Sequence, residues 1–362
     1  MNELLLIDAM TGATIQTLAG VSAENSLSVS PHGDKVYYLD SGGVEIVTTN
    51  TGSITTELQN EPISYFFLSP KGNEIYLILE ANHEVMSLPE GSTVGTYLSL
   101  GQVDTCSVRC DPYYWLAVSP DGETLYVGSN VGVIAVSTPG AAAPFLLVPD
   151  SYVGAVAVSP DGSALYVFSA SSSYFQIVNA ATGAVENTIS TPGCFNGSIA
   201  LDVSANYAYL GSGCGPVLPI NLTTQTAEPA IPGTYGTALA VNPKGTYLLA
   251  SADYGNSVAA VNTATGRQIG SIPIAANGIV FSPDGTKAWI AGVQSGISGV
   301  AVVDSSTLTI TNFIAGGSGG GGESIAITPD GRFVYVGGGD VIYTPTLEVV
   351  GSLSAGPPIV IH

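Results

Sequence analysis

Residues 155–169 read AVAVSPDGSALYVFS, two apolar segments on either side of a Pro-Asp-Gly turn. The first four residues alternate small and β-branched side chains, a pattern that indicates a strand covered on both faces. Proline fixes its own φ angle and glycine accepts a positive φ, so the Ser-Pro-Asp-Gly segment at 159–162 predicts a chain reversal. The apolar run around Tyr166 then predicts a second strand. Together they form a β-hairpin.

The same hairpin recurs along the chain. Its turn has prolines at positions 31, 70, 120, 160, 243, 283 and 329, and a shorter, degenerate copy at 203–206 fills the wide gap. A third strand then ends in a polar turn, as in VNAATG at 178–183 and VNTATG at 261–266, and a fourth strand follows. Four short strands every ~40–45 residues predict an all-β protein made of the four-stranded antiparallel blades of a β-propeller. Six positions after most of the prolines stands an aromatic residue: Tyr37, Tyr76, Tyr126, Tyr166, Trp289 and Tyr335.

This repeat resembles that of the YVTN-repeat propellers, relatives of the lactonase-like propellers, and the resemblance covers essentially the whole chain. We therefore expect residues 1–362 to form a single propeller domain. Eight first hairpins predict eight blades, with nine, or seven and an appendage, as the alternatives. A strand pair at 4–19 and an extra strand at 359–361 predict a ring closed by pairing of the two termini, which would cover an exposed sheet edge.

The composition excludes several classes of protein. The chain has 28 Asp and Glu against 7 Lys and Arg, a net charge of −21, yet only 10% of its residues are charged and 45% are hydrophobic. Disordered chains show the reverse pattern. Nucleic-acid binding is not expected, because too few cations are present to neutralise phosphates. No apolar run reaches the ~20 residues of a membrane span.

The blade topology sorts the charges. The turns that join strands one to two and three to four share one face, and the remaining loops form the opposite, top face. Six of the seven cations are predicted on the turn face: Lys35, Lys71, Lys244, Lys287, Arg267 and Arg332. The top face keeps carboxylates and aromatic residues, which favours binding of a protein or carbohydrate ligand. The predicted binding residues are Tyr113, Tyr114, Tyr152, Tyr235, Asp111, Asp150 and Glu323.

The four cysteines are predicted to form two disulfides. Cys194 and Cys214 flank the two strands of one hairpin on the top face, and Cys106 and Cys110 share one long loop. Two pairings that both suit a disulfide indicate an oxidising compartment, so we expect an extracytoplasmic protein, secreted, periplasmic or at the cell surface. Four reduced thiols in a cytosolic protein are the alternative.

No catalytic residue is predicted. The three histidines, His32, His83 and His362, fall in different parts of the repeat, and no Ser-His-Asp set can be assembled. We therefore expect a recognition or scaffold module without a cofactor. The resemblance implies one alternative, a calcium-dependent lactonase-like hydrolase at the central channel. A structural subunit of a cell-surface layer or fibre is the other. Calcium would use the carboxylates of Glu24, Glu61, Asp111, Asp150 and Glu323.

Overall fold

The structure is a computed structural model of the 362-residue chain. By their contacts the residues form two compact units, one of Ser22–Pro192 and one of Met1–Val21 with Gly193–His362. Among the described residues there is no helix long and apolar enough to span a membrane. The structure describes residues 3–8, 14–19, 27–30, 35–40, 43–48, 54–59, 63, 65–69, 74–79, 84–89, 92, 95–99, 116–129, 131–137, 145–150, 153–169, 173–191, 198–202, 206–211, 215–234, 238–251, 256–316, 325–328, 330–336, 340–352 and 358–361.

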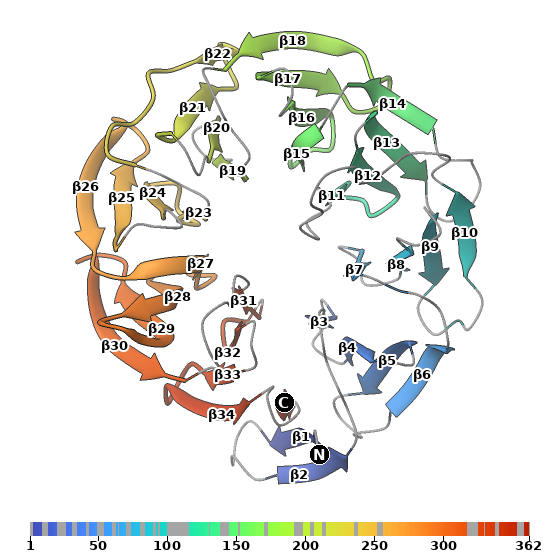
Figure 1. The fold of residues 1–362 in the computed structure, drawn as a ribbon, viewed down its shortest axis with the longest axis vertical. Coiled ribbons are helices and arrows are strands. Elements are labelled where there is room, and N and C mark those ends of the chain that lie inside the picture. Colours follow the sequence, from blue (N-terminus) through green and yellow to red (C-terminus); the bar gives the residue numbers. More distant parts are fainter. Residues whose placement is uncertain are drawn as a thin grey trace. The chain divides into compact units, whose positions relative to one another are not determined.

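The unit of residues 22–192 holds four antiparallel sheets, each made of four strands that are consecutive in the chain (Figure 1). The described strands therefore confirm the all-β prediction in this half of the sequence. The sheets are β3 (Leu27–Val29), β4 (Lys35–Asp40), β5 (Gly43–Thr48) and β6 (Ile54–Gln59); β7 (Tyr65–Leu68), β8 (Glu74–Leu79), β9 (Glu84–Pro89) and β10 (Thr96–Ser99); β11 (Leu116–Val118), β12 (Thr124–Ser129), β13 (Gly132–Ser137) and β14 (Phe145–Pro149); and β15 (Val153–Val158), β16 (Ala164–Ser169), β17 (Tyr174–Asn179) and β18 (Val185–Ser190).

The second unit repeats this arrangement in four further sheets. They are β19 (Ile199–Asp202), β20 (Tyr207–Leu210), β21 (Leu218–Asn221) and β22 (Thr226–Ala227); β23 (Leu239–Val241), β24 (Tyr247–Ala250), β25 (Val258–Asn262) and β26 (Arg267–Ile272); β27 (Ala275–Phe281), β28 (Lys287–Gln294), β29 (Ile297–Asp304) and β30 (Thr309–Ala315); and β31 (Ile325–Ile327), β32 (Phe333–Val336), β33 (Asp340–Tyr343) and β34 (Glu348–Ser352).

The two ends of the described chain pair with each other, as predicted. A three-stranded sheet of order β2-β1-β35 joins β1 (Glu3–Asp8) and β2 (Thr14–Ala19) to β35 (Pro358–Ile361). The β1–β35 pairing is parallel and forms a sheet of its own, separate from the eight four-stranded sheets. The number of blades and the single domain stay predictions.

The strand register places the recurrent aromatic residue at one equivalent position of the first hairpin. Tyr166 pairs with Ala157 across the first hairpin of its sheet, and Trp289 pairs with Val280 at the same position of another. The register also places Tyr209, opposite Ala200, in this series, although the turn before it lacks the Pro-Gly signature. Leu249, opposite Ala240, takes the position in its sheet.

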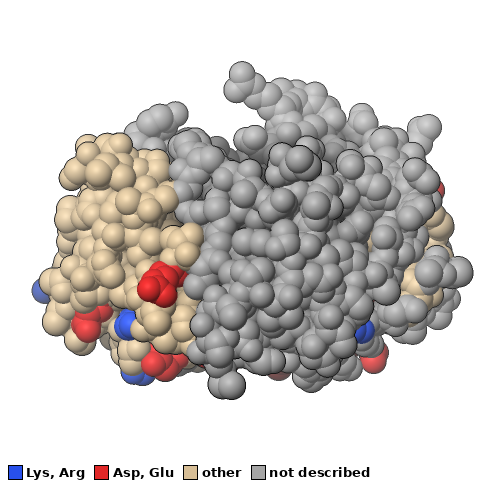
Figure 2. Space-filling view, turned by 90° about the horizontal axis from the view of Figure 1, so that it is seen from below, with Lys and Arg blue, Asp and Glu red and all other residues tan. Residues whose placement is uncertain are grey.

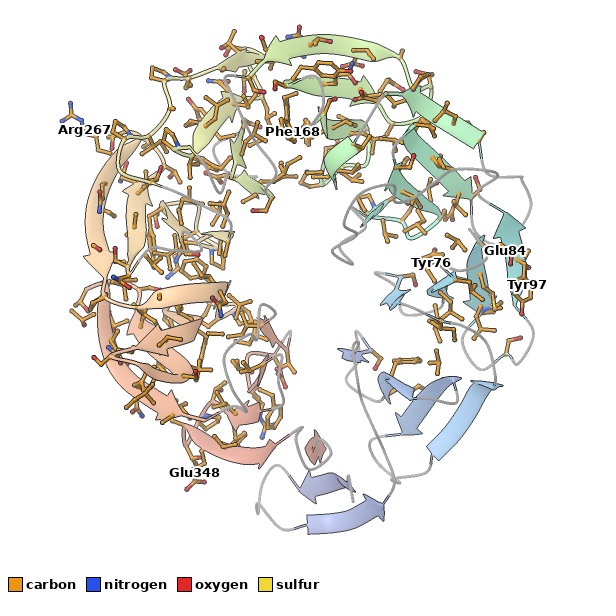
Figure 3. All side chains as sticks on the ribbon, in the orientation of Figure 1. Tyr76, Glu84, Tyr97, Phe168, Arg267 and Glu348 are labelled. Carbon is orange, nitrogen blue, oxygen red and sulfur yellow. The ribbon has the colours of Figure 1, made fainter. Side chains whose placement is uncertain are left out.

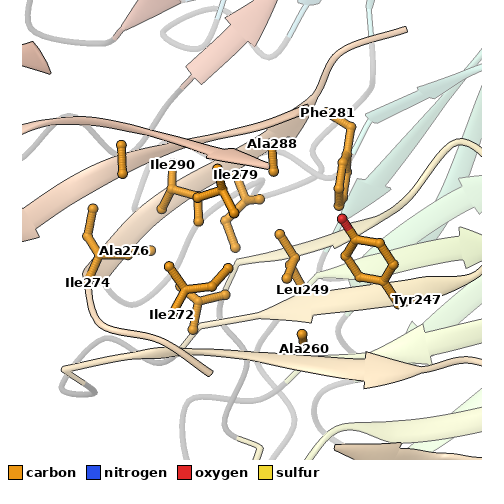
Figure 4. Packing of buried hydrophobic residues seen from close by; sticks show 13 residues of the cluster. Tyr247, Leu249, Ala260, Ile272, Ile274, Ala276, Ile279, Phe281, Ala288 and Ile290 are labelled. Carbon is orange, nitrogen blue, oxygen red and sulfur yellow. The ribbon is translucent and has the colours of Figure 1, made fainter. Parts of the chain in front are cut away.

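Neighbouring sheets pack face to face through apolar side chains. One cluster joins the sheets β23–β26 and β27–β30, where Leu249 and Ile272 lie against Ile279 and Ile290 (Figure 4). Comparable clusters join β3–β6 to β7–β10, β11–β14 to β15–β18, β19–β22 to β23–β26 and β27–β30 to β31–β34. Sheet-on-sheet burial of this kind supplies the main stabilising free energy of such a fold.

Each sheet has a turn end and a loop end. In the sheet β15–β18, the N–H of Ala180 in the second turn donates to the carbonyl of Ser163 in the first turn, 3.0 Å away. In β31–β34, the hydroxyl of Thr344 donates to the carbonyl of Gly331 over 2.7 Å. We call the end that holds both turns the turn end. The opposite end, with the remaining connections, is the loop end.

Turns of neighbouring sheets also touch one another. The hydroxyl of Tyr76 donates to the carbonyl of Gly122 in the next sheet, 2.8 Å away, and the side-chain amide of Asn242 donates to the carbonyl of Gly285 over 3.1 Å. A methyl group at Gly162 would lie 3.2 Å from Cδ of Pro120. The described Pro-Gly turns of neighbouring sheets, at 120–122 and 160–162 and at 243–245 and 283–285, therefore lie at the same end, as the sequence predicted.

A β-bulge recurs between the third and fourth strands. In β17–β18, for example, the register slips between Ile177 and Val178. No residue of β17 therefore lies directly opposite Glu186 in the strand pairing. Seven of the third–fourth strand pairs show such a slip, β1–β2 included. A bulge bends and twists the fourth strand, which is an edge strand of its sheet.

Candidate functional site

Polar side chains at the turn end form hydrogen bonds within their own turns. The hydroxyl of Ser159 accepts the N–H of Ala164 over 2.9 Å and donates to Asp161 Oδ1 over 2.6 Å. The same oxygen of Asp161 accepts the N–H of Ser163 at 3.0 Å. These hydrogen bonds stabilise the chain reversal, and the Asp161 carboxylate accepts them from residues of its own turn. Equivalent hydroxyl–carboxylate pairs are Ser119–Asp121, Ser282–Asp284 and Thr328–Asp330.

These hydrogen bonds change the acidity of the turn carboxylates. The Ser159 hydroxyl, together with the N–H of Ser163, lowers the pKa of Asp161 to about 2. The pKa of Asp284 falls to about 2 mainly through the hydroxyl of Ser282. In the second type of turn, the hydroxyl of Ser306 has the same effect on the pKa of Asp304. All three are strongly ionised and unsuited to proton transfer near neutral pH.

We predict that these three aspartates stabilise the fold above pH 4 and cease to do so in strong acid. Their pKa values are about 2 in the folded chain, against 3.8 for an ordinary aspartate, so between these values the unfolded chain binds more protons. The combined variant Asp161→Asn, Asp284→Asn and Asp304→Asn should melt below the wild type at pH 6. This difference should shrink as the pH falls through 4 toward 2. A difference in melting temperature that grows in acid would contradict the assignment.

The cations of the described chain lie beside these carboxylates. Lys244 lies within a Pro-Gly turn, and Lys287 is the first residue of a strand that leaves one. Over the tan part of the surface at the left of Figure 2, blue and red atoms are neighbours near the lower edge. In Figure 3, Arg267 and Glu348 on fourth strands point away from the ribbon, whereas Phe168 is buried. Lys35, Arg267 and Arg332 also begin or precede strands at the turn end, as predicted, whereas Lys71 lies outside the described residues.

At the loop end, Asp150 connects two sheets. Its N–H donates to the carbonyl of Val131 over 2.9 Å, which fixes the backbone just after β14. The hydroxyl of Ser169, at the loop end of β16 in the next sheet, donates to Asp150 Oδ1 over 3.0 Å. Ser169 is fully buried and Asp150 is partly buried. The structure therefore places Asp150 at the loop end, where the topology predicted it.

The other predicted site residues lie outside the described residues. This holds for both predicted disulfides, for the aromatic platform and for most of the calcium ligands. Among the described residues, no group of three or more His, Cys, Asp or Glu side chains could hold a metal ion. The binding and metal predictions therefore stay predictions. The residues outside are Tyr113, Tyr114, Tyr152, Tyr235, Asp111, Glu323, Glu24, Glu61, Cys106, Cys110, Cys194 and Cys214.

Two polar features were not predicted. Ser169 is one, because its contact with Asp150 depends on how two sheets pack. The other is the buried Asp202 at the degenerate turn, where it pairs with Tyr207. Burial, and next the nearby charge of Asp202, raise the pKa of Tyr209. If the repeats are aligned by the ends of their first strands instead of by the Pro-Gly motif, Asp202 takes the position that precedes the turn.

Comparison with known proteins identifies the architecture. No family model matches the sequence, and no match was found among curated proteins. A solved structure of dihydro-heme d1 dehydrogenase NirN in complex with DHE is 14% identical, with a TM-score of 0.68 over 96% of this chain and 76% of that one. Its matched fold is a β-propeller. The chain is a β-propeller.

Two further solved structures share this fold. Hydrazine synthase from Kuenenia stuttgartiensis is 19% identical, with a TM-score of 0.53 over 71% of this chain and 87% of that one. A chain of the mitotic checkpoint complex is 15% identical, with a TM-score of 0.53 over 87% of this chain and 86% of that one. At such identities these similarities concern the fold, because unrelated functions share one propeller scaffold. The YVTN subtype stays a prediction.

Proposed function

We propose that this propeller is a non-catalytic recognition module outside the cytoplasm, which binds a protein or carbohydrate ligand at its loop ends. One contrast carries the proposal. Asp161 and Asp284 at the turn ends accept hydrogen bonds from their own turns, whereas Asp150 lies at a loop end, is partly buried and accepts a hydrogen bond from Ser169 of the next sheet. Binding residues commonly lie on the loops of a rigid scaffold. The extracytoplasmic location rests on the two cysteine pairs of the sequence.

The ligand chemistry follows from the residues that the sequence brings to this end. Carboxylates with few cations near them attract basic groups and accept hydrogen bonds from sugar hydroxyls. Tyrosines add flat apolar surfaces on which a sugar ring or an arginine side chain can stack. Asp111, Asp150 and Glu323 would therefore act as acceptors. Tyr113, Tyr114, Tyr152 and Tyr235 would provide the platforms.

Two sets of variants with equal charge test the proposal. A loop-end variant carries Asp111→Asn, Asp150→Asn and Glu323→Gln. A turn-end variant carries Asp121→Asn, Asp161→Asn and Asp330→Asn. Both change the net charge from −21 to −18 (−21 + 3), so any difference between them reports position rather than total charge. Each is applied, with the wild type, to a glycan array and to a set of lysine- and arginine-rich peptides.

We expect the wild type to bind a subset of these probes and the loop-end variant to bind them at least about tenfold more weakly. The turn-end variant should bind like the wild type, although it melts earlier. Equal losses in the two variants would contradict a loop-end site. Calcium-dependent hydrolysis of a sugar lactone would replace the proposal with the lactonase-like alternative.

A further inference from the structure

One asparagine of the first strand β27 lies outside the regular strand pairing. Ala276 lies opposite Gly292 and Gly278 lies opposite Ala291, so the register slips at Asn277. Ala276 and Gly278 are buried, whereas Asn277 is exposed. A β-bulge of this kind leaves its extra residue unpaired and disrupts the ladder around it. Asn277 is therefore an exposed residue at a local break in the pairing, near the loop end where β27 begins.

The side chain of Asn277 is not held by hydrogen bonds. Its amide has no hydrogen-bond partner among the residues that the structure describes. Two other asparagines of the same unit are held: Asn312 Oδ1 accepts the N–H of Phe313 at 2.9 Å, and Asn262 Oδ1 accepts the N–H of Thr265 at 2.9 Å. The amide of Asn277 can therefore rotate toward its own backbone.

The residue that follows makes this amide chemically reactive. The backbone nitrogen of Gly278 can attack Cγ of Asn277, and glycine hinders this attack least because it has no Cβ. The bond between the nitrogen and Cγ forms as the bond between Cγ and Nδ2 breaks, so ammonia leaves and a succinimide ring remains. Water then opens the ring at either of its two carbonyl carbons. The products are aspartate and isoaspartate, in which the backbone runs through the former side chain.

The Asp-Gly pairs of the turns are held against the corresponding reaction. In the turn at 282–285, the N–H of Gly285 donates to the carbonyl of Ser282 over 2.8 Å. Asp284 Oδ1 accepts the hydroxyl of Ser282 over 2.6 Å and the N–H of Thr286 over 2.9 Å. Both the attacking nitrogen and the carboxyl group are thus fixed in the turn. Equivalent bonds hold the pairs at 121–122, 161–162 and 330–331.

We infer that Asn277-Gly278 is a site of spontaneous deamidation in the folded protein, with solvent water as the second reactant. The change makes the net charge more negative, from −21 to −22 (−21 − 1), near the loop end of this sheet. Isoaspartate also inserts one atom into the backbone between Ala276 and Ile279, which pack in the core between two sheets (Figure 4). The modification is independent of the proposed loop-end ligand.

Incubation of the folded chain in weakly alkaline buffer made with heavy-oxygen (¹⁸O) water tests the inference. Trypsin releases residues 268–287 as one peptide, which contains both Asn277 and Asp284. Mass spectrometry should find labelled aspartate and isoaspartate accumulating at position 277, and isoaspartate at position 284 should form at least about tenfold more slowly. The label identifies conversion during incubation, because digestion takes place in ordinary water.

A synthetic peptide of residues 268–287 is the reference without a fold. Asn277 should convert at a similar rate in the peptide and in the folded chain, whereas Asp284 should isomerise faster in the peptide. Asn277→Gln is the matched variant, because it keeps the amide but needs a larger ring. It should show no labelled product at position 277 over the same period, with the fold unchanged at this exposed position.

Two results would overturn the inference. One is an intact amide at Asn277 in the folded chain while the free peptide converts, since the strand would then protect this residue. The other is equal conversion at Asn277 and at Asn312, which is also exposed but precedes Phe313. Neither the bulge nor the glycine would then determine the site.

Discussion

Trp289→Ala is expected to lower the free energy of unfolding by about 3–5 kcal/mol, a large share of the stability of a domain. Trp289 is 1% exposed and lies in the recurrent aromatic position of its sheet. It packs with Val300 and Val302 of its own sheet and with Val334 and Ile342 of the next. Alanine would leave a cavity between two sheets, which the stiff strands on either side cannot close.

Urea unfolding followed by far-ultraviolet circular dichroism measures this loss, since most of that signal comes from the peptide backbone, which both proteins share. Ile269→Ala is the control, because Ile269 is 52% exposed on β26 and its removal should cost less than about 0.5 kcal/mol. A loss below about 1 kcal/mol in Trp289→Ala would mean that the two sheets do not depend on each other. The cluster around Trp289 would then contribute little to holding these two sheets together.

Gly132→Ala should destabilise the chain by about 3 kcal/mol and disturb Asp150. Gly132 has a φ of +135°, and its added methyl group would lie 1.9 Å from the carbonyl oxygen of Val148 and 2.8 Å from the N–H nitrogen of Asp150. Both are backbone atoms and cannot turn aside. The variant should therefore lose stability and, if the proposed site is correct, ligand affinity as well.

Gly296→Ala is the control that distinguishes the cost of a positive φ from the cost of the steric clash at Gly132. Gly296 has a φ of +81°, but a methyl group there would meet nothing within 4 Å. This control should cost only about 1 kcal/mol, the price of a left-handed conformation for alanine. Thermal melting of both variants compares the two effects. Equal losses would show that the collision at Gly132 is relieved by movement of the hairpin.

Much of the fold could be predicted because the information is local. Proline and glycine in each turn, and alternation in each strand, specify hairpins without reference to the rest of the chain. The blade that begins at β19 was harder, because Asp202 stands where other copies carry a serine, threonine or asparagine before the proline. The pairing of β19 with β20 shows which of its residues are equivalent to those of the other copies. The parallel direction of β35 could not be predicted, since a strand sequence does not state which way its neighbour runs.

The site was less predictable than the fold. The place of Asp150 at the loop end followed from counting strands, and the structure confirms it. Its contact with Ser169 did not follow, because that contact joins residues of two sheets whose relative register is set by packing. Convergence of the other carboxylates and tyrosines depends on long connections. Connections of this kind carry no repeating pattern from which a position could be inferred.

The recurrent bulge has a consequence for how this protein behaves when crowded. With only 10% charged residues, the chain lacks the dense lysines and glutamates that many β-proteins place on their borders. Irregular backbone replaces them: a fourth strand that twists away cannot align its amides with those of another molecule over a long ladder. The protein should therefore stay dispersed at high concentration instead of stacking laterally into cross-β fibrils.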